Sequence, residues 1–193
     1  MSQSPSAAVG QVSADGQFQW DGTQWVPIPR GTREPTPWTR PMQLAGAALL
    51  AAEAVYYLGA TIAFTTREAV KRALAAQGTQ IPPSMSEDAY FNFVIATAIA
   101  FVAVFSALEI LGAVGAYFRW RWAFWYVLVL MVLGGLNAIF NAVSIVRSSA
   151  ANLPVGVLAI QELLCIAAAA MFVWMLTGVI RYGPWAMKRP GQY

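Results

Sequence analysis

The 193-residue sequence has no histidine and a single cysteine, Cys165. Histidine is the commonest metal ligand and general base, so its absence excludes the usual zinc and acid–base sites. One thiol makes neither an internal disulfide nor a cysteine zinc site, and Cys165 lies in an apolar run, as a small packing residue does. Charged residues are only 11% of the chain, against about 25% in soluble domains. The composition therefore excludes an ordinary soluble metalloenzyme.

Long apolar stretches take up most of the sequence, and 58% of its residues are hydrophobic. About 20 apolar residues in a helix cross the roughly 30 Å hydrocarbon core of a bilayer. The pattern predicts transmembrane helices at about 42–65, 89–117, 123–146 and 155–180. The expected fold is an all-α membrane protein, with a four-transmembrane-helix bundle over 42–182. The first 40 residues lack an apolar run, so we expect no cleavable signal peptide and insertion through the first span.

Four segments outside the membrane domain differ from one another in composition. Residues 1–16 are rich in Ser, Ala and Gln without periodicity, so we expect a disordered tail. Residues 17–29 read as a β-hairpin in which Asp21 and Gly22 form a type I′ turn, with Trp20 and Trp25 packed across it as candidate partner-binding residues. Residues 30–41 are a linker rich in Pro and Arg, and 183–193 are a C-terminal tail.

The hairpin string Trp20-Asp-Gly-Thr-Gln-Trp25-Val-Pro resembles the short Trp-Asp-Gly-x-x-Trp modules at the ends of many actinobacterial membrane proteins. The likeness covers about 13 residues, and the Trp-Tyr-x-Asp-Pro segment that precedes the motif in other modules is missing. The whole chain resembles the small, Ala-rich four-span integral membrane proteins of actinobacteria that have no assigned role. These resemblances imply a bacterial inner-membrane protein, and they leave two interpretations of the hairpin open, an interfacial hairpin or a partner-binding module.

Three glutamates lie within the predicted spans, namely Glu53, Glu109 and Glu162. A charge at the bilayer centre costs roughly 2.5–3.5 kcal/mol on insertion scales, so these acids are candidate functional groups. Tyr56 and Tyr57 follow Glu53 by three and four residues, where a phenol reaches back along the helix. The alternative is that protonated acids and amides hold neighbouring helices together.

Further polar and small residues recur at helical spacing. One stripe along the second span consists of Ser106, Glu109, Gly112 and Gly115, and it predicts close helix packing. A second, on the third span, consists of Gly134, Asn137, Asn141 and Ser144. Counting residues from the helix ends predicts two polar layers, Glu53 with Glu109 and Asn141 with Glu162.

Basic residues near the span ends predict the orientation. With both termini inside, eight basic residues face the cytoplasm and four face outward, at positions 67, 71, 72 and 147. The outer loop is then 66–88, and a belt of aromatic residues marks the inner interface, comprising Tyr117, Trp120, Trp122, Trp125, Tyr126, Tyr182 and Trp185.

Two functional interpretations remain open. The first is a non-enzymatic accessory or scaffold subunit of a membrane complex, with the lipid bilayer and a partner protein as its contacts. The second is a small oligomeric transporter or proton-coupled channel that works through Glu53, whose position midway along the first of four helices resembles that in small multidrug transporters. The sequence shows no nucleophile–base pair, phosphate loop or metal cluster, so we expect no enzyme activity, no cofactor and no nucleic-acid partner.

Overall fold

The computed structural model describes residues 8–27, 33–79, 81–146 and 154–188. Its long helices are α1 (Thr39–Phe64), α3 (Glu87–Tyr117), α4 (Arg121–Val146) and α5 (Val155–Arg181). Each is long and apolar enough to cross a membrane. They confirm the predicted four-transmembrane-helix fold, with ends within a few residues of the predicted limits, and identify a multi-pass membrane protein.

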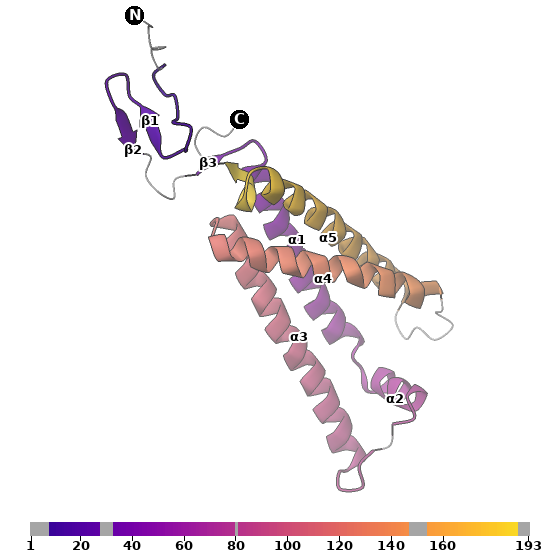
Figure 1. Ribbon diagram of the computed structural model, residues 1–193. Coiled ribbons are helices and arrows are strands. Elements are labelled where there is room, and N and C mark those ends of the chain that lie inside the picture. Colours follow the sequence, from indigo (N-terminus) through magenta and orange to yellow (C-terminus); the bar gives the residue numbers. More distant parts are fainter. Residues whose placement is uncertain (1–7, 28–32, 80, 147–153, 189–193) are drawn as a thin grey trace, which may run out of the picture.

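The four long helices pack as two antiparallel pairs that cross, α1 with α3 and α4 with α5 (Figure 1). Small residues allow this packing, because a Cβ added at Gly112 would lie 3.1 Å from Leu50 of α1, and one added at Gly135 would lie 3.0 Å from the Ala169 backbone of α5. The stripe predicted on the second span is therefore a packing surface. α3 also meets α4 through the tight connector between them, where Gly115 lies against Ala123.

The segment between α1 and α3 forms a separate short helix, α2 (Arg67–Ala76). Thr66 caps its N-terminus, with the hydroxyl accepting a bond from Ala69 N at 3.3 Å. An ion pair of 2.9 Å joins Arg67 to Asp88 in the first turn of α3. Ser86 caps α3 in the same way, because its hydroxyl accepts from Ala89 N at 3.3 Å.

The N-terminal sheet is built around the predicted hairpin, with β1 (Phe18–Trp20) antiparallel to β2 (Trp25–Pro27). Trp20 lies opposite Trp25, and the two ring centroids are 5.6 Å apart. The predicted type I′ turn is wrong, because only Gly22 has a positive φ, +107°, and the loop has four residues. The reason is the Asp21 carboxylate, which accepts bonds from the backbone N–H groups of Thr23 at 2.7 Å and Gln24 at 2.8 Å and so closes a wider loop.

A third strand-like segment completes this sheet. Gly10 N donates to Trp20 O at 2.8 Å, and Ser13 N donates to Phe18 O at 2.9 Å, so residues 10–13 run antiparallel to β1. Composition predicted a disordered tail through residue 16, whereas residues 8–16 form this segment and its turn. Backbone hydrogen bonds to β1 hold residues 8–16 in place, and local composition does not predict such bonds. Residues 1–7, and the predicted end of the hairpin at 28–29, lie outside the described residues.

The C-terminal residues fold back onto the start of α1 in an arrangement that we call the terminal clasp (residues 33–39 and 183–188). It contains β3 (Glu34–Pro35), the single turn η1 (Pro184–Ala186) and β4 (Met187–Lys188), with β3 antiparallel to β4. The hydroxyls of Thr36 and Thr39 both donate to Ala186 O, at 2.7 and 3.1 Å. The clasp places both ends of the transmembrane domain at the same end of the helices (Figure 1).

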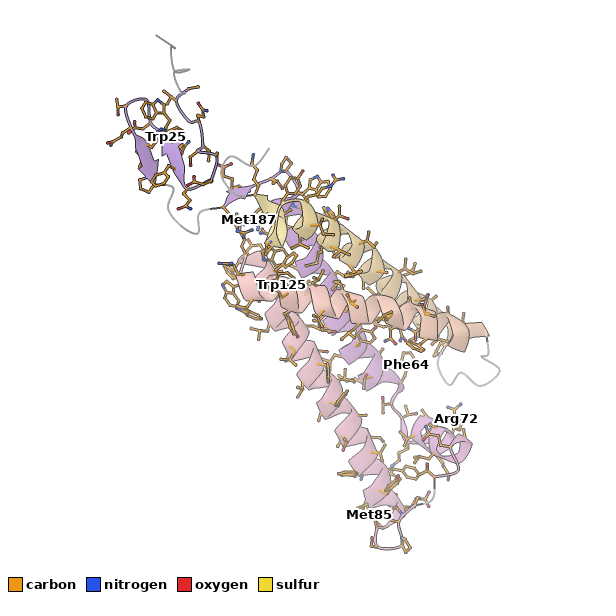
Figure 2. The ribbon with its side chains drawn as sticks, viewed as in Figure 1. Trp25, Phe64, Arg72, Met85, Trp125 and Met187 are labelled. Carbon is orange, nitrogen blue, oxygen red and sulfur yellow. The ribbon has the colours of Figure 1, made fainter. Side chains whose placement is uncertain are left out.

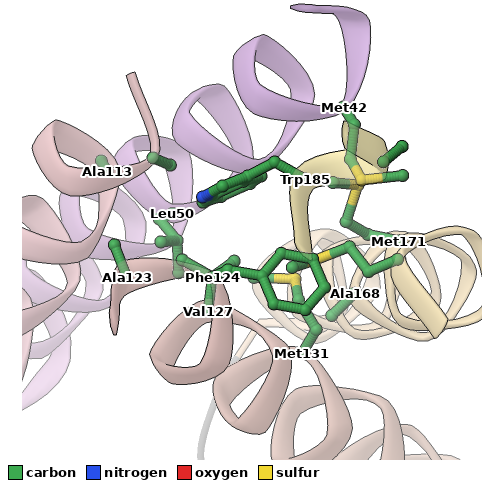
Figure 3. Packing of buried hydrophobic residues seen from close by; sticks show 13 residues of the cluster. Met42, Leu50, Ala113, Ala123, Phe124, Val127, Met131, Ala168, Met171 and Trp185 are labelled. Atoms are coloured by element: carbon green, nitrogen blue, oxygen red, sulfur yellow. The ribbon is translucent and has the colours of Figure 1, made fainter. Parts of the chain in front are cut away.

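Trp185 anchors the clasp in the hydrophobic core, where it is 1% exposed. Its ring packs edge-on against Phe124, with centroids 5.2 Å apart, and its indole N–H donates to Trp120 O at 3.0 Å (Figure 3). The sequence placed Trp185 in the aromatic belt, and this expectation was wrong because the chain reverses at Gly183, with φ +106°. Trp120, Trp122 and Trp125 are exposed, as the belt requires.

Candidate functional site: an intramembrane polar centre

Two glutamates from neighbouring helices form the carboxyl pair, Glu53 on α1 and Glu109 on α3. They lie close enough to interact electrostatically. The helices approach closely here because the Ser106 hydroxyl, one turn before Glu109, donates to Ala54 O at 3.1 Å. A Cβ added at Gly134 of α4 would lie 3.9 Å from Glu53 Oε1, so α4 covers the pair. The predicted pairing of Glu53 with Glu109 is therefore present.

Among the residues that the structure describes, the carboxyl pair has no compensating partner. Glu53 is 7% exposed, and no described residue donates a hydrogen bond to its carboxyl. One carboxyl oxygen of Glu109, Oε2, is fully buried without a hydrogen-bond partner. The described ion pairs involve Arg67, Lys71 and Lys188, all outside the apolar helices. Buried polar groups in proteins are nearly always bonded, so this pair differs from acids that only hold helices together.

A second group of polar side chains lies between α1, α4 and α5. The Tyr57 hydroxyl lies beside the Cys165 thiol. Asn141 Nδ2 donates to Cys165 Sγ at 3.5 Å, and Gln161 Nε2 donates to Asn141 Oδ1 at 3.4 Å. Together with the carboxyl pair, these four residues make up the polar centre.

The predicted layer of Asn141 with Glu162 is replaced by Asn141 with Gln161 and Cys165. Successive residues of a helix point about 100° apart, whereas residues four apart share a face. Gln161 and Cys165 therefore face α4 together, and Glu162 is turned away. Its Oε2 is buried without a partner among the described residues.

The remaining candidates are placed as follows. Asn137 is exposed on α4, one turn before the half-buried Asn141 on the same helix face, as predicted. The side chain of Ser144 lies outside the described residues. Tyr56 does not bond to Glu53, since its hydroxyl donates to Val157 O at 2.6 Å. Among the described residues, no group of three or more His, Cys, Asp or Glu side chains is placed to hold a metal ion.

Two polar residues of the core were missed by the sequence analysis as sites. Cys165 was interpreted as packing only, although Gln161 one turn earlier marks a polar face of α5. Gln43 is fully buried at the other end of α1, and both polar atoms of its amide lack partners in the described part of the chain. Gln43 could have been recognised from the sequence as a single amide inside an apolar run.

A cavity of about 200 Å³ opens between the second half of α1 and the start of α5. We call it the α1–α5 cavity. Hydroxyl and amide groups contribute much of its wall, which is lined by Tyr56, Tyr57, Ala60, Thr61, Phe64, Thr65, Val157 and Gln161. Tyr57 and Gln161 therefore belong both to the wall of this cavity and to the polar centre.

The N-terminal sheet carries a separate candidate surface, the aromatic face (Phe18, Trp20, Trp25 and Pro27). The strand register puts these side chains on one side of the sheet. Phe18 and Trp25 are 37% and 42% exposed, and Trp25 lies beyond the end of the helices (Figure 2). They also line a pocket with Asp15. Bonds from the Ser13 hydroxyl and from Gln17 N hold the pKa of Asp15 below its usual value, so this carboxylate is charged at neutral pH.

The chain was compared with protein-family models, curated proteins and solved structures. No family model, curated protein or solved structure matches the chain. The function is therefore inferred from the chemistry of the polar centre and of the aromatic face.

Proposed function

We propose that the chain is a non-enzymatic accessory or scaffold subunit of a bacterial inner-membrane complex. The observation that carries this proposal is the aromatic face, where Phe18 and Trp25 are 37% and 42% exposed on a sheet that is small. A short sheet is marginally stable alone in water and gains from docking. Exposed Trp and Phe side chains are the usual anchors of protein interfaces.

The charge of the sheet indicates the kind of partner. Residues 8–27 contain two acids, Asp15 and Asp21, and no basic residue. The pocket formed by Asp15, Phe18 and Trp25 combines a carboxylate with two aromatic rings. This combination binds a guanidinium or ammonium group through an ion pair and a cation–π contact. The partner is accordingly a protein segment that carries Arg or Lys.

Mass measurement of the protein extracted in mild detergent tests this proposal. The wild type is expected above the 20.9 kDa mass of one chain, and Phe18→Ser with Trp25→Ser is expected to release the single chain. Val26→Ser is the matched control, because Val26 is 39% exposed and the strand register puts it on the opposite side of the same sheet. A multiple of the chain mass identifies a homo-oligomer instead of a second protein. A wild type that is monomeric, or a complex unaffected by the double substitution, contradicts the proposal.

The proposed location includes cytoplasmic N- and C-termini. The pairing of β3 with β4 supports a shared side for both ends, and the excess of basic residues supports the cytoplasmic side. In a Cys165→Ala background, Ser84→Cys in the loop before α3 is expected to react with an impermeant thiol reagent added outside intact cells. Reaction only after lysis reverses the orientation.

A second candidate function is a small, oligomeric transporter or proton-coupled channel working through Glu53. The specific observation in its favour is that Glu53 and Glu109 have no compensating partner in the described part of the chain. Proton flux in vesicles containing purified protein, followed by a trapped pH-sensitive dye, tests this function. Glu53→Gln is expected to abolish the flux, whereas Glu68→Gln on the exposed α2 leaves it unchanged. Equal flux from both variants excludes the role of Glu53.

A further inference from the structure

The α1–α5 cavity lies on one side of the carboxyl pair, toward the end of α1. Tyr57 lines the cavity and lies four residues after Glu53, on the same face of α1. Four residues correspond to about 6 Å along the helix. A single helical turn therefore separates a polar cavity from a carboxyl buried in the membrane domain.

Tyr57 lies one helical turn from Glu53 on α1, and Cys165 lies one turn from Gln161, a residue of the cavity wall, on α5. Tyr57 interacts electrostatically with Glu53, and its hydroxyl lies beside the Cys165 thiol. Cys165 also interacts electrostatically with Glu53. The amide of Asn141 holds the sulfur in place from α4, at 3.5 Å. Hydroxyl and thiol groups both donate and accept hydrogen bonds, so they can pass a proton along a chain.

Apolar side chains pack on the opposite side of Glu53. Leu50, Val127, Met131 and Met171 occupy the core between the pair and the terminal clasp, and each is at most 5% exposed (Figure 3). Apolar cavities stay dry, because water needs polar partners. Water reaches the pair more readily from the face of the membrane where α1 ends.

We propose that Glu53 and Glu109 form a proton-binding pair that exchanges its proton with water in the α1–α5 cavity through the Tyr57 hydroxyl and the Cys165 thiol. In each transfer a hydroxyl or thiol passes its own proton to one neighbour and receives another from the opposite neighbour, so its charge is unchanged afterwards. Two carboxylates this close in a poor solvent for charge do not both ionise readily, which favours a proton on the pair.

The titratable groups that face the pair come from all four membrane helices. α1 contributes Tyr57, α3 contributes Glu109 itself, α4 contributes Tyr126, and α5 contributes Cys165 with Glu162 next to it. None of these groups is a permanent cation. The proton is therefore the charge that compensates the pair. This inference is independent of docking by the aromatic face, and it deepens the second candidate function.

Labelling with a hydrophobic carbodiimide tests the proposal on the complete chain. The reagent adds to a protonated carboxyl, with the carboxyl oxygen bonding to the central carbon and the proton passing to nitrogen, and peptide mass locates the product. Sealed vesicles allow the pH to be set separately on each side, and an affinity tag on a terminus identifies the side. Labelling of Glu53 or Glu109 is expected to fall, approaching about tenfold per pH unit for one titrating proton, when the pH is raised on the side opposite the termini. Raising the pH on the terminal side is expected to change nothing.

Adjacent tyrosines provide a matched pair of variants. Tyr57→Phe removes the hydroxyl of the proposed route and is expected to slow the response of labelling to a pH jump several-fold. Tyr56→Phe removes a hydroxyl that bonds Val157 O instead of the Cys165 thiol, and is expected to leave the response unchanged. No labelling of either glutamate, a response to the terminal side, or equal rates in the two variants overturns the proposal. If labelling follows the expected side but vesicles show no proton flux, the proton site stands and transport fails.

Discussion

Replacing Trp185 is expected to loosen the terminal clasp and to destabilise the membrane domain. The side chain is 1% exposed, and Phe124 packs against its ring at 5.2 Å. Truncating a buried aromatic side chain costs about 3–5 kcal/mol, including the cavity that it leaves. The lost bond to Trp120 O adds to this cost, because the carbonyl is left without its indole partner. For a chain of this length 1 kcal/mol lowers Tm by about 2–4 °C, so Trp185→Ala should lower it by roughly 6–20 °C.

The sole cysteine provides the assay without further engineering. Cys165 is 1% exposed, so a dye that fluoresces on reacting with a thiol reports unfolding in detergent as the temperature rises. Trp122→Ala is the control, because Trp122 is 49% exposed on the aromatic belt and should shift Tm by no more than about 2 °C, as surface substitutions do. Trp185→Phe, which keeps much of the ring packing, should fall between the two. Equal shifts for Trp185→Ala and Trp122→Ala would refute the burial argument.

Two further predictions concern helix packing and the hairpin loop. Gly135→Val is expected to push α4 away from the Ala169 backbone and to lower the free energy of unfolding by about 1–3 kcal/mol. Gly59→Val is the control, because a Cβ at Gly59 has nothing within 4 Å. The same thiol-dye melting assay compares the two variants. The pKa of Asp21 is lowered by bonds from Gln24 N, then from Thr23, so its contribution to the sheet is present at neutral pH and is lost as the pH falls below about 4. Near-ultraviolet circular dichroism, which is sensitive to the facing Trp20 and Trp25, should show a transition at this pH in the wild type and none in Asp21→Ala. The same transition in both proteins would show that another group causes it.

Hydropathy predicted the transmembrane domain well. The four spans depend on composition over some 20 consecutive residues, which is a local signal. The pairing of Glu53 with Glu109 also followed from counting residues along the two helices.

The features that sequence reasoning missed depend on helix rotation and on distant contacts. Depth placed Glu162 beside Asn141, but rotation about α5 gives that position to Gln161 instead. Trp185 reaches the core because it and Ala186 take positive φ angles, +57° and +52°, which non-glycine residues seldom adopt. Contacts with residues far along the chain hold that conformation, such as the Thr36 hydroxyl on Ala186 O and the Trp185 indole on Trp120 O. No local pattern encodes such a turn.

The terminal clasp has a consequence for how the protein is made. A protein enters the bilayer from its N-terminus while synthesis continues, so residues 33–39 wait beside the membrane until residues 183–188 leave the ribosome. The core around Phe124 stays open during that interval, because Trp185 fills it last. The core is therefore completed only after all four spans have been made, and quality-control proteases meet an unsealed helix end in any chain that stops before Gly183. A premature stop that spares every membrane span would still yield an unstable protein.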